Sequence, residues 1–236
     1  MKASCNQILR LLLPPIVALT TLGAGCPTAS QVGEKPPDRS TTFAPEYDYM
    51  EGYDVFPYGH GTASTAFAPC STKLQVWYDE EIRPAELLDW NSVGGYMYEH
   101  AQKTGSGAEV KLKHGAYLIA VQDVYNRPPD SSVTLGYTDS GGEEGWAWTV
   151  VFVQTIRDIF PGDTLAINHA VIHEMGHMRA NLTELCDPAT GEMSDYHNDG
   201  SCVMGDVKVP PCTGTDASAN PHFCSACCWQ LMHVQW

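Results

Sequence analysis

The sequence predicts an α+β domain with a mixed, twisted sheet, one long helix and an irregular, cysteine-rich C-terminal part. Several stretches between residues 72 and 160 are dense in Val, Ile, Tyr and Trp and are separated by Pro, Asp and Gly, which is typical of strands. A helical repeat of apolar residues follows these stretches. After Leu185 the composition shifts to Gly, Asp, Asn, Pro, Thr and Cys. With 236 residues, 43% of them hydrophobic, the chain can bury one main core.

Residues 1–26 have the pattern of a signal peptide. A basic start with Lys2 and Arg10 is followed by an apolar run and by small residues before Cys26. The run is short and contains two adjacent prolines, so a permanent membrane helix is the weaker interpretation. LGAGC resembles the lipoprotein box of bacteria, in which Cys26 would carry a lipid anchor; ordinary signal cleavage is the alternative, because the leucine lies one position too far away. We expect an exported protein, either secreted or held as a lipoprotein on a bacterial cell envelope.

Residues 27–69 are rich in Pro, Gly, Ser and Thr and lack a helical or strand period. They are expected to form a tether or pro-region before a domain that spans residues 70–236. The formal net charge of the chain is -15. This acidity argues against nucleic acid or an anionic membrane as a partner, and we expect a monomer.

The elements of the domain are predicted in order along the chain. KLQVWYDEE, which follows Thr72, alternates as a strand does, and DWNSVGGYMYEHAQKTG is expected to form a helix that ends at Gly105. GAYLIAVQDVY, SVTLGYTD and GWAWTVVFVQTIRDIF then predict three more strands.

The long helix is predicted from PGDTLAINHAVIHEMGHMRA. Asp163 or Thr164 can cap its N-terminus. Apolar residues recur at helical spacing on one stripe, which consists of Val171, Met175, Met178 and Leu182. His173 and His177 are one helical turn apart on roughly the opposite side. One face of the helix is therefore expected to pack and the other to present two imidazoles.

HEMGH within this helix has the HExxH pattern of zinc hydrolases. Histidines one turn apart can direct two ring nitrogens at a single Zn2+, and the glutamate can hold a metal-bound water and accept its proton. His173 and His177 are therefore predicted as zinc ligands and Glu174 as the general base. The alternative is an accidental match on a buried helix, expected on the order of once in a hundred chains of this size. His169 cannot easily converge with the other two, so it is expected behind the ligands or on the surface.

The order of strand, helix, further strands, HExxH helix and a methionine in SCVMG resembles a metzincin metallopeptidase. In that clan the motif runs HExxHxxGxxH and a methionine turn lies beneath the metal; the resemblance places Met204 in that turn. Ala180 stands at the position of the bend glycine and Thr183 at that of the third ligand, so both depart from the pattern. Asn181 can adopt the left-handed conformation and end the helix instead.

Among metzincins the chain is most similar to the archaemetzincins, whose motif is followed by Cys, by Cys-x-Met and by Cys-x-x-Cys. The same order occurs here in Cys186, Cys202, Cys224 and Cys227. The resemblance implies that these cysteines hold a second, structural zinc ion. Export argues for disulfides, such as one between Cys186 and Cys202 and two more among Cys70, Cys212, Cys224, Cys227 and Cys228, and this is the favoured interpretation. The cysteines after residue 26 are odd in number, so one is unpaired, pairs with Cys26 or binds metal.

The third zinc ligand is predicted to be His197. It is the histidine between the motif and Met204, and a third neutral imidazole would leave a fourth position open for water. The alternatives are three acidic residues, Glu184, Asp187 and Glu192. Tyr196, beside His197, could stabilise an oxyanion, although packing is the more ordinary role for such a tyrosine.

The combined prediction is an exported zinc-dependent metalloendopeptidase that contains one catalytic Zn2+ and, if the cysteines bind metal, a second structural one. A zinc-bound water would hydrolyse a peptide or protein substrate with Glu174 as general base. The alternative is a catalytically inactive exported binding protein on the same fold; the missing bend glycine favours it, and retention of Glu174 opposes it. Hydrolysis of a non-peptide amide is a third interpretation.

Overall fold

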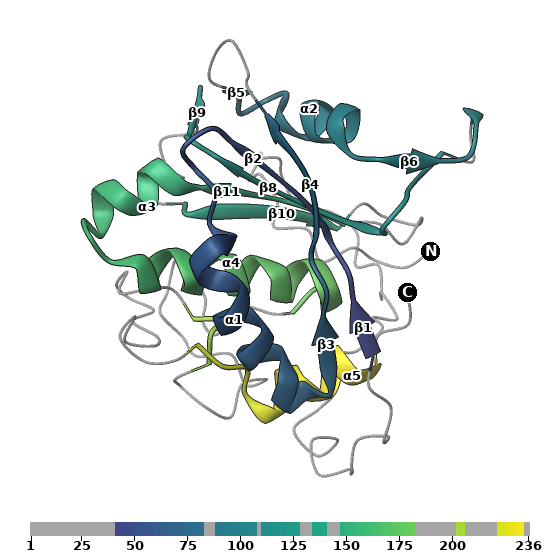
Figure 1. Ribbon diagram of the computed structural model, residues 1–236, viewed down its shortest axis with the longest axis vertical. Helices are drawn as coiled ribbons and strands as arrows, with labels where there is room; N and C mark the ends of the chain where they lie inside the picture. The colour runs from purple at the N-terminus through teal and green to yellow at the C-terminus, as the bar shows by residue number, and fades with distance from the viewer. Residues whose placement is uncertain are drawn as a thin grey trace, which may run out of the picture.

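The computed structural model describes residues 41–82, 88–107, 110–127, 134–140, 147–182, 202–205 and 221–233. The predicted α+β class is confirmed, because a five-stranded mixed sheet lies between helices (Figure 1). The predicted signal peptide, residues 1–26, lies outside the described part of the chain.

The central sheet has the strand order β10-β11-β8-β2-β4. These strands are, in the same order, Gly136–Ser140, Ala147–Phe152, Ala116–Val121, Glu46–Met50 and Trp77–Ile82. β11, β8, β2 and β4 run parallel to one another, and β10 pairs antiparallel with β11. Among the described strands β10 has one neighbour, so it forms an edge of the sheet.

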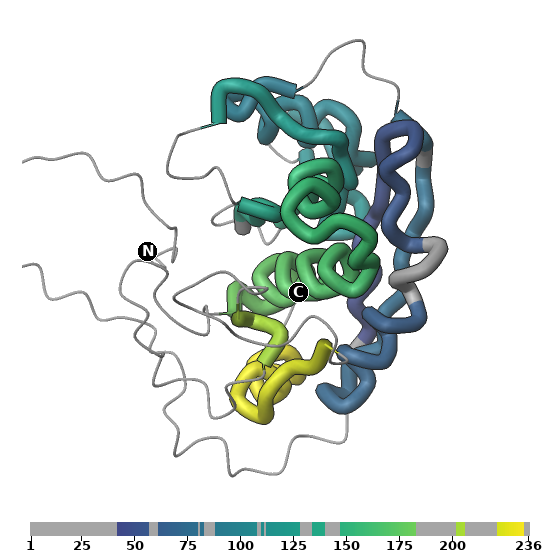
Figure 2. Tube along the Cα trace, turned by 90° about the vertical axis from the view of Figure 1, so that its left-hand side faces the viewer, coloured from purple at the N-terminus to yellow at the C-terminus, as the bar shows by residue number. Residues whose placement is uncertain are grey.

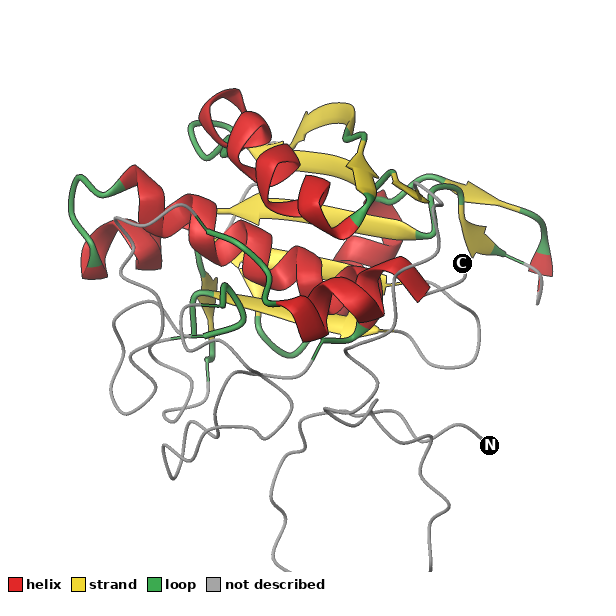
Figure 3. Ribbon diagram, turned by 90° about the horizontal axis from the view of Figure 1, so that it is seen from below, coloured by secondary structure: helices red, strands yellow, loops and turns green. Residues whose placement is uncertain are grey.

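Both faces of the sheet are covered by helices. β8 is buried along its whole length; Leu118 packs into the core cluster shared with α1 (Phe56–Phe67) and α4 (Thr164–Ala180), and Ile119 into the cluster beside α2 (Val93–His100). A strand buried on both faces is an apolar run rather than an alternating one, as the sequence of β8 shows. Figure 3 shows helices, in red, lying across the strands of the sheet, in yellow.

The expectation that residues 27–69, the predicted tether or pro-region, lack helices and strands is wrong from Thr41 onward. β1 (Thr41–Phe43) pairs in parallel with β3 (Thr72–Leu74), and β2 lies inside the central sheet between β4 and β8. The helix α1 and a short 3-10 helix, η2 (Ala68–Cys70), follow. The sequence did not predict β2, because this strand is buried on both faces and includes Asp48, so polar and apolar residues do not alternate in it. Removing this stretch as a pro-region would take an inner strand out of the sheet.

Asp54 links the end of β2 to the start of α1. Its Oδ1 atom accepts hydrogen bonds from the Phe56 N–H at 3.0 Å and from the Tyr47 hydroxyl at 2.9 Å. The same hydroxyl accepts a hydrogen bond from the Val55 N–H at 3.0 Å. Two N–H groups at the beginning of the helix are thereby satisfied without a side-chain cap from Val55 itself.

Several of the predicted elements differ from the structure in their extent. The strand expected after residue 72 divides into β3 and β4. The helix α2 ends at His100 rather than near Gly105. The last predicted strand ends at Phe152, and the chain continues as the helix α3 (Val153–Ile159), in which the buried Val153 and Ile156 are three residues apart, as on one face of a helix.

Two small sheets complete the described strands. β5 (Leu88–Asp89) pairs in parallel with β9 (Val124–Tyr125), and β6 (Lys103–Thr104) pairs antiparallel with β7 (Lys111–Leu112).

The C-terminal helix α5 (Ser225–His233) packs against η2 and α4. Figure 2 shows α5, in yellow, next to α4, in green. A disulfide joins Cys70 in η2 to Cys228 in α5 across 158 residues of sequence. This bond fits an extracellular protein. None of the helices in the described ranges is long and apolar enough to cross a membrane.

Three carboxylates lie together where β2 and β4 meet, and they belong to Glu46, Asp48 and Asp79. Each of them has an oxygen within 4.8 Å of the others. Glu46 accepts a hydrogen bond from the Gln102 N–H at 2.9 Å, and Asp48 accepts one from the Tyr117 hydroxyl at 2.7 Å. Burial, aided by the charges of Asp48 and Asp79, raises the pKa of Glu46 from 4.5 to about 7.

Glu46→Gln is expected to stabilise the protein at pH 8 and to leave stability unchanged near pH 4. The raised pKa means that the folded state holds a proton that the unfolded state releases, so this contribution to the free energy of unfolding is fully present below pH 4.5 and is lost as the pH rises through about 7. Each pKa unit corresponds to about 1.4 kcal/mol, and after allowance for solvent screening near the exposed Asp79 we expect a gain of about 1–2 kcal/mol at pH 8.

Urea unfolding of both proteins at pH 4 and pH 8 measures this difference. Glu99→Gln on the exposed side of α2 is the control, since it makes the same chemical change away from the cluster. A Glu46→Gln gain that is equal at both pH values would contradict the prediction.

Candidate metal centre

The helix α4 begins and ends as its sequence predicts. The Asp163 Oδ1 atom accepts hydrogen bonds from the N–H groups of Leu165 and Ala166, at 2.9 and 3.2 Å. At the other end Asn181 has φ 49° and ψ 46°, and its N–H donates to the His177 carbonyl at 2.7 Å. Asparagine tolerates this left-handed conformation better than most residues, so it ends the helix where the bend glycine is missing.

α4 is buried on nearly every side, which makes its polar residues informative. The predicted apolar stripe is confirmed as core, since Val171, Met175, Met178 and Leu182 are all buried. His173 and Glu174 are also buried, with 9% and 7% of their surfaces exposed. Burying a polar side chain costs free energy unless it forms hydrogen bonds or binds an ion, so the contacts of these residues indicate what the site can bind.

The side chains of His173 and His177 converge. Their Nε2 atoms lie 3.0 Å apart. The Nδ1 atom of His173 is 3.0 Å from the Val203 carbonyl oxygen, and that of His177 is 2.7 Å from the Leu182 carbonyl oxygen. A carbonyl oxygen can only accept, so each Nδ1 carries a hydrogen, and in the neutral form of each ring the Nε2 atom keeps its lone pair.

This arrangement fits a metal ion. Two nitrogens that each carry a lone pair cannot hydrogen-bond to each other, and a cation between them removes the repulsion. Ligands of a tetrahedral zinc ion, each about 2.0–2.1 Å from the metal, lie about 3.4 Å apart, close to the separation seen here. Histidine ligands commonly donate the other ring N–H to a backbone carbonyl in this way.

Glu174 is held from the edge strand β10. The Thr138 hydroxyl lies 2.5 Å from the Glu174 Oε2 atom and 2.7 Å from the hydroxyl of Thr149. Because the carboxylate only accepts, Thr138 gives it its one proton and receives the proton of Thr149. A Cβ at Gly136 would lie 2.6 Å from the Glu174 Cγ atom, so the strand can approach the carboxylate only because this residue is glycine.

The sequence analysis did not predict that Gly136 and Thr138 belong to the site. Their spacing within SVTLGYTD places both on one face of the strand, and this was the available signal. Which face meets α4 depends on the pairing of β10 with β11 and is therefore decided by the tertiary structure.

A tight turn, Cys202–Gly205, lies beneath α4. The Gly205 N–H donates to the Cys202 carbonyl at 3.0 Å and closes it. Met204 is fully buried, and a Cβ at Gly176 would lie 2.8 Å from its sulfur. The glycine inside HEMGH thus lets the methionine of SCVMG pack directly against the helix.

His169 is not on the surface, which corrects one of its two predicted placements. Only 2% of its surface is exposed, and its Nε2 atom lies 2.8 Å from the Gly205 carbonyl oxygen. Its ring centroid is 6.5 Å from that of His173. As expected, it does not converge with the other two histidines.

Several predicted site residues lie outside the described ranges. They are the third-ligand candidates and the oxyanion candidate, together with one cysteine: His197, Glu184, Asp187, Glu192, Tyr196 and Cys186. Their roles stay predictions.

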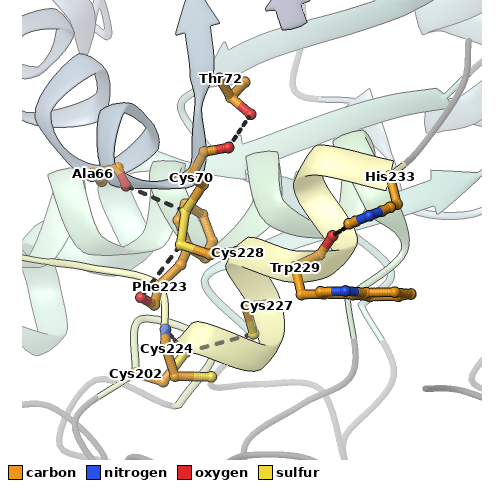
Figure 4. The surroundings of a disulfide bond; sticks show 10 residues. All are labelled: Ala66, Cys70, Thr72, Cys202, Phe223, Cys224, Cys227, Cys228, Trp229 and His233. Atoms are coloured by element: carbon orange, nitrogen blue, oxygen red, sulfur yellow. Dashed lines mark hydrogen bonds between the residues drawn. A yellow bond between two sulfur atoms is a disulfide. The ribbon is translucent and has the colours of Figure 1, made fainter. Parts of the chain in front are cut away.

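Cys202, Cys224 and Cys227 form a further candidate metal-binding group, in which the sulfurs all lie within 4.8 Å of one another (Figure 4). The Cys202 and Cys227 sulfurs are 3.7 Å apart, far beyond the length of a disulfide bond, which is about 2.05 Å. Sulfurs bound to a tetrahedral zinc ion at about 2.3 Å lie about 3.8 Å apart. The Cys224 N–H also donates to the Cys202 sulfur at 3.3 Å.

The favoured prediction of disulfides is therefore right for Cys70 and Cys228, which pair with each other, and wrong for Cys224 and Cys227, which form no disulfide with a described residue. The reason is that the turn and the beginning of α5 direct three sulfurs at one point, whereas Cys228 points away toward η2 (Figure 4). Pairing of Cys186 with Cys202 falls outside the described residues.

Comparisons with known proteins add little to this geometry. No protein-family model matches the chain, and no curated protein matches it. Among solved structures, the chain is similar to a zinc-dependent peptidase from Methanocorpusculum labreanum (strain Z), with 17% sequence identity and a TM-score of 0.43. The similarity covers 79% of this chain and 99% of that one. A similarity at this level does not establish the chemistry of the site.

Proposed function

We propose that this chain is a zinc-dependent metallopeptidase whose metal is held by His173 and His177. The observation that carries the proposal is the convergence of their Nε2 atoms at 3.0 Å, with each Nδ1 atom held by a backbone carbonyl. Neutral imidazoles are suited to Zn2+, and backbone carbonyls orient both rings.

His197 is proposed as the third ligand. Asn181 ends α4 four residues after His177, so the chain leaves the helix next to the histidine pair. It returns at Cys202, in the turn whose Val203 carbonyl contacts His173. A histidine between these two points can reach the pair, and three imidazoles leave a position for water.

Glu174 is proposed as the general base. When bound, zinc lowers the pKa of a water molecule and polarises a peptide carbonyl. The Glu174 carboxylate accepts the proton of the attacking water and transfers it to the departing amine. The Thr138 hydroxyl fixes the orientation of this carboxylate from the side of β10, so the base does not have to be ordered during the reaction.

A second, structural zinc ion is proposed for Cys202, Cys224 and Cys227, with Cys186 as the fourth ligand. The support is the 3.7 Å separation of the Cys202 and Cys227 sulfurs together with their burial. Zinc binds cysteine in its thiolate form, and a site closed by four cysteines is the usual structural form.

Export before folding is proposed as well. The support is the signal-like residues 1–26 together with the Cys70–Cys228 disulfide. The intact mass of the exported protein tests it: cleavage after residue 25 with a lipid on Cys26 indicates a lipoprotein, and an unmodified new N-terminus elsewhere removes the lipid anchor.

Zinc content and peptide cleavage together test the function. The purified exported chain is expected to contain two zinc ions, and His197→Ala to contain one and to have lost cleavage of a denatured protein substrate. Cleavage products are identified by mass spectrometry of their new N-termini. Glu192→Ala is the control for the acidic alternative and is expected to keep both ions.

Each contrary outcome points to a different error. Full zinc content in His197→Ala would remove His197 as the ligand. Zinc bound at the histidines of the wild-type chain without cleavage of any peptide would overturn the peptidase proposal and favour an inactive binding protein.

A further inference from the structure

Two parallel hydrogen bonds join α4 to the turn beneath it. His169 Nε2 lies 2.8 Å from the Gly205 carbonyl oxygen, and His173 Nδ1 lies 3.0 Å from the Val203 carbonyl oxygen. The two histidines are one helical turn apart, and the two acceptors are two residues apart in one turn. The contact that orients His173 is therefore one of a pair, and His169 makes the other.

The His169 ring is suited to this single contact. The Gly205 oxygen only accepts, so the Nε2 atom carries the hydrogen. Only 2% of the His169 surface is exposed. Its Nδ1 atom has no hydrogen-bond partner among the described atoms. An apolar residue at position 169 would fill the same space without burying an unsatisfied nitrogen. The advantage of histidine over an apolar residue here is therefore its hydrogen bond to Gly205.

The turn itself transmits the effect of this bond. Cys202 and Gly205 close it through a backbone hydrogen bond of 3.0 Å, and Met204 packs between Val203 and Gly205 against Gly176. Movement of the Gly205 carbonyl would therefore move Val203, since the two residues share one closed and buried turn.

We propose that His169 is a positioning residue of the metal centre: by donating to Gly205 it holds the turn so that the Val203 carbonyl keeps His173 protonated on Nδ1 and oriented toward His177. The proposal rests on the proposed zinc site, but not on peptide cleavage. His169 does not contact the metal; it acts through the turn.

Zinc affinity and the tautomer of His173 test this role in the full chain. The affinity is measured by competition with a chelator of known affinity, and the tautomer by the imidazole nitrogen shifts of the metal-free protein. In His169→Leu the zinc affinity is expected to fall about 10-fold, at the low end of the 10- to 100-fold range for residues that orient ligands. His173 is expected to change from one tautomer to a mixture.

His169→Gln is the rescuing variant, because its side-chain amide can donate to the Gly205 carbonyl from nearly the same place. It is expected to keep zinc affinity within about threefold of the wild type, a small part of the loss expected for an orienting residue. His169→Asn has the same amide on a shorter side chain and is expected to behave like His169→Leu.

A folded His169→Leu variant with unchanged affinity and one His173 tautomer would overturn the proposal, and so would equal losses in the Gln and Leu variants. If His169→Leu does not fold, the Gln and Asn variants decide: a difference between them supports the role, and equal affinities oppose it. Both measurements are made without substrate, so absence of peptide cleavage in the wild type would end the peptidase proposal and leave this one standing.

Discussion

Glu174→Gln is expected to abolish peptide cleavage while the fold and the zinc content stay unchanged. Glutamine has the same shape and can still accept the hydrogen bond from Thr138, which is 2.5 Å from Oε2 in the wild type. It cannot accept a proton from water. Loss of a general base typically costs about 10²- to 10⁴-fold in rate, and we expect a fall in kcat/KM of about 1,000-fold.

The measurement is kcat/KM on a fluorogenic peptide that the wild type cleaves, together with zinc per chain and the melting temperature. Glu99→Gln, on the exposed part of α2, is a control for the same substitution away from the site. Residual activity within tenfold of the wild type would mean that another group accepts the proton. Loss of zinc in Glu174→Gln would mean that the glutamate acts as a ligand.

Thr138→Val tests how much the orientation of the Glu174 carboxylate contributes to the rate, because the carboxylate itself is kept. Valine has the shape of threonine and lacks the hydroxyl that contacts Glu174 and Thr149. Because the carboxylate remains, the expected loss in kcat/KM is about 10-fold, with a stability cost of about 1 kcal/mol for the lost hydrogen bonds.

Cys227→Ala is expected to lose one zinc ion and most of the stability of the C-terminal part. Cys202, Cys224 and Cys227 are buried and their sulfurs lie within 4.8 Å of one another, so removing one leaves the others as an incomplete metal site. Structural zinc typically contributes about 10–16 kcal/mol of apparent binding free energy in small zinc domains, so a fall in melting temperature well above 10 °C is expected.

Cys228→Ala is the matched control, because Cys228 is the next residue of α5 but belongs to the disulfide with Cys70. It is expected to keep both zinc ions and to lose about 4–5 kcal/mol, the value expected for a closed loop longer than 100 residues. A reducing agent should lower the stability of the wild type and of Cys227→Ala, but not that of Cys228→Ala.

The zinc content and a thiol count in denaturing, metal-free buffer decide between zinc and disulfides. Four or more thiols with two zinc ions support the cysteine site. Unchanged zinc in Cys227→Ala would show that these three sulfurs bind no metal.

The two centres share one turn, which gives the cysteine variant a second expected effect. Cys202 contributes its sulfur to the cluster, while the carbonyl of the next residue, Val203, contacts His173. Disruption of the cluster is therefore expected to weaken zinc binding at the histidines, whereas Cys228→Ala is expected to leave it unchanged.

The sequence by itself determined the local features of the site. The cap at Asp163, the left-handed end at Asn181 and the apolar stripe of α4 all follow from residues close together in the chain. The HExxH spacing places two imidazoles one helical turn apart, and helical geometry alone brings their nitrogens together. Helix capping and hydrophobic periodicity depend on residues close together in the chain, so both could be predicted without the tertiary structure.

Only the tertiary structure decided the contacts between distant residues. It placed β2 inside the sheet, brought Thr138 to Glu174, set Val203 against His173 and paired Cys70 with Cys228. Each of these contacts depends on which strand face or which turn meets α4. A strand that is buried on both faces lacks the alternation of polar and apolar residues by which a strand is recognised. A backbone carbonyl is present in every residue, so the sequence does not indicate which carbonyl will accept a hydrogen bond. These contacts could therefore not be predicted from local sequence patterns.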